Sequence, residues 1–353
     1  MKLKLLLAVL IFPLAAHAQQ RDTIGVVAQL DSLLKVSYAL ANEAKFDQAL
    51  AVTQAAENLV VEGMGKEHLT YGRVCSAYAQ LFFNQRELDK AKEWRLRALD
   101  ITGRCMGNDH VAYASELTNL SFLYQSMGQN VDSEMALLDA KKIYEAKCGK
   151  SHPKYAGAVI TLATLYSQMD EAEKAESLFL EAKNLFESGL IDKSDPRYRI
   201  CLNNLAIFYA QFGLNQNAER LFKQSLEIVK IDFGEDHPEY ARGLNNLAAN
   251  YLEMEQYAAA EPLMLLAKSI MEKLKATEAP VYAEILGNLG FLYLYLGDLV
   301  KAEPFLEQAL SIEEKVSGRQ HYRTANWLGS LAILKWKQDD FQKAETFYLE
   351  ALA

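Results

Sequence analysis

The sequence has few of the residues that interrupt helices and none of the common motifs that carry chemistry. Its 353 residues include only 7 prolines and 18 glycines, which fits a mostly helical chain because both residues are unfavourable inside helices. It contains no H-E-x-x-H, G-x-S-x-G, P-loop or EF-hand signature. We therefore predict that these residues form no enzyme active site and hold no cofactor or metal.

Long apolar runs are missing except at the N-terminus. Lys2 and Lys4 precede about twelve apolar residues that end in an A-x-A triplet at Ala18, which together have the form of a secretory signal peptide. We predict that residues 1–18 are removed before Gln19, so that the mature chain is exported to the periplasm or secreted. The run is shorter than the roughly 20 residues of a membrane anchor. No later stretch is long and apolar enough to span a bilayer.

Positively charged residues are also fewer than negatively charged ones. The formal net charge of the chain is −9, and it becomes more negative once a leader with two lysines is removed. An acidic surface repels phosphate backbones, so we expect no nucleic-acid partner. The balance of charge says little about protein partners.

What the sequence has in abundance is self-similarity at a period of 42 residues, seen most clearly from His237 to Glu278. A fixed period of this length indicates stacked helical hairpins rather than one globular core. After a short linker at residues 19–25, residues 26–353 divide into eight repeats. Their spacing is 42 throughout, except for 43 between the fourth and fifth. The repeats start near Val26, His68, His110, His152, Asp195, His237, Ala279 and His321.

The residue pattern of each repeat predicts two helices. The first has a leucine and, four residues later, an aromatic residue, which places both on one helix face. The leucines are Leu120, Leu162, Leu205, Leu247, Leu289 and Leu331, and the aromatic residues are Phe82, Tyr124, Tyr166, Tyr209, Tyr251 and Tyr293. The second helix has small residues two turns apart, and we expect them to set the distance between helices because larger side chains would overpack. The first of these columns runs through Ala49, Ala91, Ser133, Ala175, Ala218, Ala260, Ala302 and Ala344.

Glycine and proline mark the ends of the predicted helices. A turn between the two helices of a repeat is marked by Gly128, Gly213 and Gly297. In most connectors a glycine stands three residues before the next repeat, as Gly107 does before His110, and we predict that it ends the second helix in a left-handed conformation. Four repeats then open their first helix at a proline, where the missing N–H costs nothing. These are Pro153, Pro196, Pro238 and Pro280.

These columns resemble tetratricopeptide repeats (TPR), and the pattern H-P-x-Y-A, L-N-N-L-A, Y, A-E-P-L resembles the longer kinesin-light-chain type, which bacterial proteins also use. The resemblance covers about residues 26–353 and is strongest in the third to seventh repeats. It implies an all-α fold, a right-handed α-solenoid of about eight helix-turn-helix units. It also implies an exported scaffold that binds a peptide or protein in a concave groove lined by the first helices.

The resemblance implies candidate peptide-binding residues. In long-repeat relatives the asparagines of the N-N-L-A motif contact peptide backbone, and a side-chain amide can both donate and accept hydrogen bonds. The polar residues at these two columns are Asn119, Thr161, Asn203, Asn204, Asn245, Asn246, Asn288 and Ser330. Two interpretations stay open, since these residues could hold a peptide or tie neighbouring first helices together. Nearby apolar residues also allow two interpretations, since they could form anchor pockets for a ligand or pack within the fold. They are Leu252, Phe291, Leu294, Tyr295 and Trp336.

Residue types that often build sites are spread along the repeats instead of clustered. The histidines His68, His110, His152, His237 and His321 share one column, so they cannot converge on one zinc ion, and we interpret them as connector residues. A glutamate column, Glu134, Glu176, Glu219, Glu261, Glu303 and Glu345, lies near the start of the second helix, where a carboxylate favours the helix dipole. Equivalent points in neighbouring repeats lie beyond the roughly 7 Å reach of a disulfide. We therefore expect free thiols at Cys75, Cys105, Cys148 and Cys201.

The eighth repeat stops at Ala353 before its second helix is complete. This would leave an apolar edge that solenoids normally cover, so we expect a C-terminal domain or a partner to cover it. A second hypothesis therefore makes the chain the N-terminal recognition region of a larger protein. By resemblance to exported bacterial proteins with similar repeats, that protein would continue into a caspase-like CHAT peptidase or a membrane-linked sensor.

Overall fold

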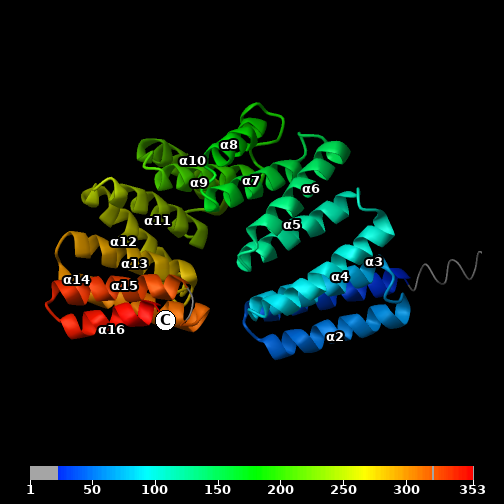
Figure 1. Ribbon diagram of the computed structural model, residues 1–353, viewed down its shortest axis with the longest axis horizontal. Helices are drawn as coiled ribbons and strands as arrows, with labels where there is room; N and C mark the ends of the chain where they lie inside the picture. The colour runs from blue at the N-terminus through cyan, green and yellow to red at the C-terminus, as the bar shows by residue number, and fades with distance from the viewer. Residues whose placement is uncertain (1–22, 320–321, 353) are drawn as a thin grey trace, which may run out of the picture. The chain divides into compact units, whose positions relative to one another are not determined.

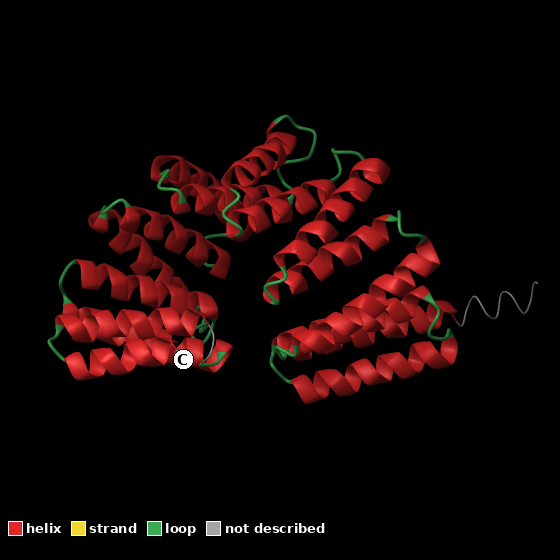
Figure 2. Cartoon of the chain, in the orientation of Figure 1, coloured by secondary structure: helices red, strands yellow, loops and turns green. Residues whose placement is uncertain are grey.

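The computed structural model describes residues 23–319 and 322–352, and within these ranges the chain is built of helices and contains no strand (Figures 1 and 2). The all-α fold predicted from the repeat columns is therefore confirmed. The predicted signal peptide, its cleavage point at Ala18 and Gln19, His321 and Ala353 lie outside the described residues. The chain divides into two compact modules, Met1–Ile191 and Asp192–Ala353. This division falls where the repeat spacing lengthens from 42 to 43.

The N-terminal module contains the first four hairpins. Its opening helix is Thr23–Asn42, and it is followed by α2 (Phe46–Gly63), α3 (Leu69–Asn84), α4 (Leu88–Met106), α5 (Val111–Ser126), α6 (Asn130–Cys148), α7 (Pro153–Gln168) and α8 (Ala172–Glu187). The second helix of each hairpin packs on the first helix of the next. Each hairpin therefore buries its apolar face only when its neighbour is present.

The C-terminal module repeats this arrangement with four more hairpins. Its helices are α9 (Pro196–Gln211), α10 (Asn215–Phe233), α11 (Pro238–Glu253), α12 (Tyr257–Lys273), α13 (Pro280–Tyr295), α14 (Leu299–Ser317), α15 (Tyr322–Lys337) and α16 (Phe341–Leu352). The four predicted prolines are the first residues of α7, α9, α11 and α13. Pro262 and Pro304 lie inside α12 and α14 rather than at a helix start.

The small-residue column of the second helices lies at the closest helix contacts. Every member from Ala49 to Ala344 is at most 4% exposed, as the expected close approach of the helices requires. The large buried side chains Tyr155, Phe179 and Phe186 fill the space between the helices. The core is therefore a continuous row of repeated contacts inside each module, and the small column sets its spacing.

The connector histidines have a defined structural role as helix N-caps. The Nδ1 atom of His110 accepts a hydrogen bond from the backbone N–H of Ala112 at 3.1 Å, and His152 does the same with Lys154 at 3.1 Å. His68 and His237 cap α3 and α11 in the same way, and Asp195 caps α9 through its carboxylate. A side-chain acceptor at this position satisfies one of the free N–H groups of a first helical turn. Ala279 has no such group, so α13 begins without a side-chain cap.

Positive φ angles recur at two places in the repeat. Glycines that end the second helices, such as Gly107 and Gly234, have φ of 92° and 82° with ψ of 149° and 173°. The sign of φ is as predicted, but the left-handed helical conformation is wrong, because this ψ belongs to an extended region that is essentially open only to glycine. The turn inside each hairpin is left-handed in every repeat, although five repeats, including those with Arg86 and Asp170, have no glycine there.

The N-terminal end corrects two sequence predictions. The helix Thr23–Asn42 begins inside the range 19–25 that was predicted as a linker. It is also long and apolar enough to cross a membrane by length and composition, so the prediction that no later stretch meets these criteria is wrong. These criteria are weak evidence here, because the helix buries Leu30 and Leu34 in the core with residues of α2 and α3.

The cysteines form no disulfide among the described residues, as expected. Cys75 and Cys201 are buried, whereas Cys105 is exposed. Burial raises the pKa of the Cys75 thiol to about 12, which keeps it protonated and unreactive at neutral pH. At the other end of the described chain, α16 exposes Phe341, Leu349 and Leu352.

Candidate functional site

Each module has a cavity between two consecutive first helices. The N-terminal cavity has a volume of about 510 Å³ and is bounded by α3 and α5, with Arg95 of α4 and Gln168 of α7 also on its wall. The C-terminal cavity has a volume of about 410 Å³ and is bounded by α9 and α11, with Phe222 of α10 between them. Both cavities are formed entirely within their own module.

The two cavities occupy the same place in the repeat. Seven residues of the N-terminal cavity have an equivalent, three repeats later, that lines the C-terminal cavity. Five of these pairs are Gln80 and Ile207, Arg95 and Phe222, Asn119 and Asn246, Leu123 and Asn250, and Ser126 and Glu253. The repeat geometry therefore creates the cavity, and the residues at these positions decide its chemistry.

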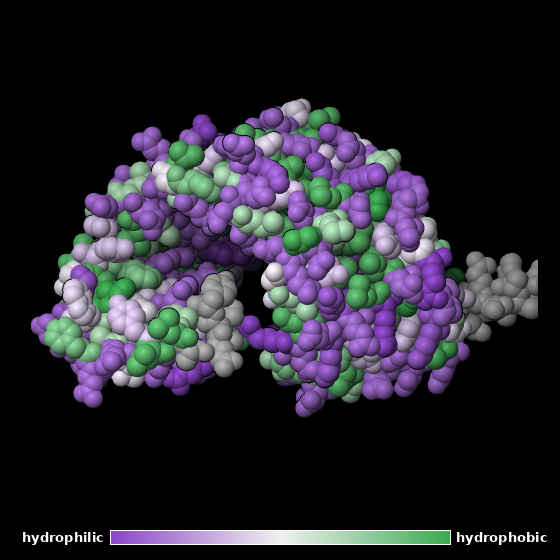
Figure 3. Space-filling view, in the orientation of Figure 1, coloured by the Kyte–Doolittle hydropathy of each residue, from purple (hydrophilic) through white to green (hydrophobic). Residues whose placement is uncertain are grey.

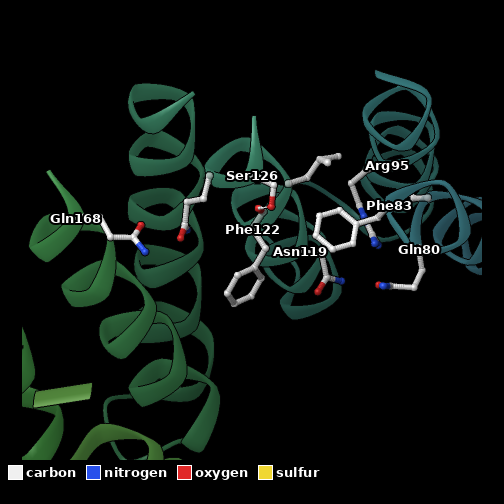
Figure 4. A pocket seen from close by; sticks show the side chains of 10 residues that line it. Gln80, Phe83, Arg95, Asn119, Phe122, Ser126 and Gln168 are labelled. Carbon is white, nitrogen blue, oxygen red and sulfur yellow. Dashed lines mark hydrogen bonds between the residues drawn. The ribbon is translucent and has the colours of Figure 1, made fainter. Parts of the chain in front are cut away.

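The N-terminal cavity combines one cation with side-chain amides and aromatic rings. Figure 4 shows the labelled side chains directed into one space from four helices: Gln80 and Phe83 from α3, Arg95 from α4, Asn119, Phe122 and Ser126 from α5, and Gln168 from α7. Arg95 is the only charged residue among those that line it. Phe122 is 50% exposed and offers an apolar contact surface at the rim.

Arg95 is buried and only partly satisfied. It is 8% exposed, and its Nη1 donates to Oε2 of Glu116 at 3.2 Å. Ser76 donates to the same carboxylate from α3. The Nε–H of Arg95 is also buried, and no atom of the described residues accepts a hydrogen bond from it.

Glu116 itself lines a second cavity of the N-terminal module, of about 400 Å³, together with Arg73 and residues of the helix Thr23–Asn42. One of these residues is Tyr38, whose pKa is raised by burial, although the positive charges of Arg95 and Arg73 act in the opposite direction. The Arg95–Glu116 ion pair therefore lies between two cavities. Its cation faces one of them and its anion faces the other.

The C-terminal cavity has a different buried polar group and a different charge. Asn250 is 2% exposed, and its Nδ2 donates to the backbone oxygen of Asn215 at 3.1 Å. Its Oδ1 is buried without a donor among the described residues. The only charged residue on the wall is Glu253, which is exposed at the rim. The buried group without a partner is thus an acceptor in this cavity and a donor in the N-terminal cavity, while the other side-chain amides on both walls can donate and accept.

The predicted asparagines divide into two groups. Asn246 donates to Oδ1 of Asn203 at 3.0 Å, and Asn288 donates to Oδ1 of Asn245 at 3.0 Å. Both bonds join first helices of neighbouring repeats, as expected if these asparagines tie the helices together. Asn245 is 3% exposed and belongs to the core.

The other candidates are placed differently. Thr161 and Ser330 donate to carbonyl groups of their own helices, those of Gly157 and Asn326, and Asn204 is half-buried on α9. Asn119 is exposed and lines the N-terminal cavity, and Asn246 lines the C-terminal cavity. The structure thus brings Asn119 and Asn246, alone among the candidates, to the wall of these cavities.

The apolar candidates near the C-terminus also differ in exposure. Leu294 is buried and packs, while Tyr295 is 66% exposed and Trp336 is 58% exposed. Tyr295 stacks on Tyr257 with ring centroids 6.0 Å apart. On the face drawn in Figure 3 hydrophilic residues predominate and apolar residues are scattered among them.

One recurring polar contact was missed by the sequence analysis. The tyrosine of a first helix donates to the glutamate of the preceding second helix: Tyr166 to Glu134 at 2.6 Å, Tyr251 to Glu219 at 2.9 Å and Tyr293 to Glu261 at 2.7 Å. In the eighth repeat Lys335 takes the tyrosine position and pairs with Glu303. Burial and the bond to Glu261 raise the pKa of Tyr293 to about 12. The sequence carried a signal for this contact, because each of these tyrosines stands 32 residues after a member of the glutamate column.

Among the described residues, no group of three or more histidine, cysteine, aspartate or glutamate side chains could hold a metal ion. The polar groups of the two cavities instead suit hydrogen bonding to a ligand. Their amides, hydroxyls and guanidinium can recognise peptide groups without a metal or cofactor.

Comparisons with known proteins agree on the fold. The tetratricopeptide repeat family matches residues 113–188, 198–273 and 281–353. No curated protein matches the sequence. Among solved structures, BtubC (BKLC) from P. vanneervenii is 22% identical, with a TM-score of 0.51 over 64% of this chain and 89% of that one.

Two bacterial regulators are also similar in structure. The quorum sensor NprR from B. thuringiensis, in its apo form, has a TM-score of 0.67 at 15% identity, over 91% of this chain and 86% of its own. The Rap conjugation gene regulator of the plasmid pLS20, solved in complex with the Phr* peptide, has a TM-score of 0.62 at 13% identity, over 92% of this chain and 94% of its own. At these identities the likeness concerns the fold alone.

Proposed function

The chain belongs to the tetratricopeptide repeat family, and on this premise we propose that it is an exported, non-enzymatic scaffold that binds an extended peptide or protein segment along the first helices of its repeats. The observation that carries the proposal is the recurrence of one polar cavity, at the same register, in both modules. A catalytic site would occur once, whereas a surface that reads an extended chain can use the same position in several repeats.

The chemistry of these walls supports a peptide ligand. An extended segment carries unpaired backbone N–H and C=O groups at almost every residue, and these groups need partners when they are desolvated. Asn119 and Asn246 present amides that can donate and accept. The Rap regulator, which is similar in fold, was solved with a peptide bound, and this analogy favours the same ligand class here.

Peptide binding is tested with an array of random-sequence decapeptides probed with the full chain. We expect the wild-type protein to bind a subset of the array, and Asn119→Ala and Asn246→Ala to weaken that binding without unfolding the protein. Thr161→Ala is the matched control, because Thr161 bonds its own helix at Gly157 and does not line either cavity. Undiminished binding by the double variant Asn119→Ala, Asn246→Ala would remove the cavities from the proposal.

Export is tested separately. The gene is expressed from Met1 in a bacterial host, and the N-terminus of the protein is determined by mass spectrometry in the cytoplasmic, periplasmic and extracellular fractions. We expect a mature chain that begins at Gln19 and lies outside the cytoplasm. A protein that keeps Met1 and stays in the cytoplasm would contradict the export part of the proposal and leave peptide binding untouched.

A further inference from the structure

We infer that the outward face of α6 in the N-terminal module is a docking surface for an amphipathic, basic helix of a partner protein. The face is formed by Val131, Met135 and Leu138, which we call the α6 stripe. It lies on a second helix, whereas the proposed peptide ligand lies along the first helices. The inference is therefore independent of the proposed function, and either can fail without the other.

Helix α6 has apolar side chains on two opposite faces. Leu137 and Tyr144 belong to one face and are at most 3% exposed, in the core of the module. The three residues of the α6 stripe follow one another at spacings of four and three, so they lie together on the opposite side of the helix. Val131, Met135 and Leu138 are 64%, 61% and 45% exposed. Helices that are apolar all round are normally covered all round, and no described residue covers this second face.

The stacking of the hairpins does not explain the α6 stripe. In the flanking second helices α4 and α8, the equivalents of its first two residues are polar, and they are Asp89, Glu93, Glu173 and Ser177. Only the third position is leucine in both, and Leu96 and Leu180 are 40% and 41% exposed. No other second helix of the chain has valine, leucine, isoleucine, methionine or an aromatic residue at all three positions. Because the repeat itself does not require these exposed apolar side chains, they indicate an interaction site.

The charges around the α6 stripe are mostly negative. Asp132 and Asp139 lie along one side of it on α6, and Asp89 and Glu173 stand at the position of Val131 in α4 and α8. These four carboxylates are exposed, and none forms an ion pair among the described residues. The cations nearest to them in sequence are already used, in the pairs Lys90–Glu87, Arg97–Glu93 and Lys174–Glu171. The stripe is therefore an apolar surface with unpaired negative charge at its edges.

This combination determines the kind of partner that fits. Side chains at spacings of four and three form a ridge that packs into the groove of a second helix. The unpaired carboxylates favour lysine and arginine on the flanks of that helix and disfavour an acidic one. They also disfavour a second copy of α6, which would bring its own Asp132 and Asp139 to the contact, and an anionic membrane surface. The partner segment is thus a helix with an apolar stripe and basic flanks.

Two synthetic helical peptides of three heptads test the chemistry of the partner. Both have leucine at the core positions of the heptad, and one has lysine on its flanks where the other has glutamate. Fluorescence anisotropy measures the binding of each peptide to the full chain. We expect the lysine peptide to bind at least about tenfold more tightly than the glutamate peptide, with an affinity that falls as salt is added. Equal binding of the two peptides, or binding of neither, would overturn the inference.

A double variant separates the α6 stripe from general attraction between opposite charges. Val131→Gln and Met135→Ser introduce the residues that Gln216 and Ser177 place at these positions, so the variant should fold as the wild type and keep its charge. It should bind the lysine peptide at least about tenfold more weakly, because two large apolar contacts are lost. Val300→Gln is the matched control, since Val300 is 84% exposed at the position of Val131 in α14. Undiminished binding by the double variant, or an equal loss in the control, would overturn the assignment to α6.

Further measurements decide between the basic helix and other occupants of the α6 stripe. Asp132→Asn combined with Asp139→Asn should weaken binding of the lysine peptide and reduce its dependence on salt, and an unchanged salt dependence would contradict the role of these charges. Sedimentation velocity should show the wild-type chain as a monomer, and it should not bind phosphatidylcholine vesicles. A dimer, or vesicle binding, that is lost in the Val131→Gln, Met135→Ser variant would assign the stripe to a second copy or to a membrane and overturn the inference.

Discussion

The two cavities have the same place in the repeat but differ in their buried polar groups. The wall of the N-terminal cavity includes a buried guanidinium whose Nε–H has no acceptor among the described residues, whereas the wall of the C-terminal cavity includes a buried amide whose oxygen has no donor among them. The positions of the walls are set by helix stacking, which is alike in both modules. The comparison teaches that in this fold the position of a binding site follows from the repeat, while its selectivity follows from the few residues at which one repeat differs from the others.

The modules also differ in how neighbouring first helices are tied. The N-terminal module uses charged groups, with Glu116 of α5 accepting from Ser76 of α3 and Arg95 of α4. The C-terminal module has ion pairs of its own, such as Arg199 of α9 with Glu239 of α11, and adds amide pairs, Asn203 with Asn246 and Asn245 with Asn288. The amide pairs therefore distinguish the C-terminal module, and they supply the contrast for the predictions below.

The largest effect is expected at Gly287, where the column of asparagines in the first helices of the C-terminal module ends. Gly287 occupies the column of Asn203 and Asn245, and the ring of Trp327 lies against it, so that a Cβ at 287 would lie 2.8 Å from Cζ2 and closer still to two other ring carbons. Gly287→Ala should therefore destabilise the C-terminal module by about 3 kcal/mol, as overpacking of a core does. Hydrogen exchange of the peptides from α13 and α15, read by mass spectrometry, measures the loss.

The matched control is Gly329→Ala in α15. No atom outside the neighbouring backbone lies within 4 Å of the Cβ position at Gly329, so the substitution should be neutral or stabilise the helix by up to about 1 kcal/mol. Equal exchange rates in Gly287→Ala and wild type would show that Trp327 has another stable position. That result would contradict the claim that close packing of Trp327 against Gly287 replaces the asparagine pairs of the preceding repeats.

The next prediction concerns the amide pairs. Asn245→Ala removes the acceptor of Asn288 from a site that is 3% exposed, and it should cost about 2 kcal/mol because a partly buried donor is left without its partner. Chemical unfolding of the full chain, with hydrogen exchange to localise the change to α11 and α13, measures it. Asn119→Ala is the control, since Asn119 is exposed and should change stability by less than about 0.5 kcal/mol. Equal losses in both variants would contradict the division of the candidates into ties and cavity residues.

The repeated features of the fold could be predicted from sequence because stacking demands the same residue type in every repeat. The small column from Ala49 to Ala344 and the helix-opening prolines are buried or placed as expected for this reason. The histidine column was predicted as connector residues, but its role as an N-cap could be recognised only from the structure, in which the Nδ1 atom lies next to the N–H of the second helical residue.

The site was harder to predict because it lies where the pattern fails. The asparagine columns were predicted as one set of peptide-binding candidates, but the sequence could not tell Asn245 in the core from Asn246 on a cavity wall, since the two are neighbours in the sequence that point in different directions from α11. Arg95 was missed because the predictions rested on residue types that the repeats share. The available signal was a charge in a column that is otherwise uncharged, and the same test for an unusual residue would have singled out Asn250 among Leu81, Leu123, Leu165 and Leu292.

The tyrosine-to-glutamate bonds give a smaller and pH-dependent contrast between the modules. Burial and hydrogen bonds to glutamate raise the pKa of Tyr282 and of Tyr293 to about 12 from the ordinary 10, and they raise the pKa of Tyr155 and Tyr166 in the N-terminal module further. Because the folded pKa lies above the unfolded value, the bonds contribute fully below pH 10. Their contribution is lost as the pH rises from 10 toward 12.

We therefore expect tyrosinate absorbance and hydrogen exchange to show the C-terminal module loosening at lower pH than the N-terminal module. Tyr293→Phe should cost about 1 kcal/mol at neutral pH, the net value of one hydrogen bond, and should reduce the dependence of C-terminal stability on pH between 10 and 12. A stability of this module that stays constant over that range in the wild type would contradict the assignment of these bonds.

The smallest effect is expected at a helix start that lacks a cap. Asp195 caps α9 through a bond of 2.9 Å to the N–H of Arg197, and it is followed by a proline at the first helical position. Ala279 precedes Pro280 with the same extended backbone, but it offers no acceptor. Ala279→Asp should therefore stabilise the C-terminal module by at least about 0.5 kcal/mol, and Ala279→Val, which keeps a side chain but cannot cap, should give no gain. Equal stability of the two variants would mean that solvent already satisfies the start of α13, and that the capping residues found in the other repeats set where a helix begins more than how stable it is.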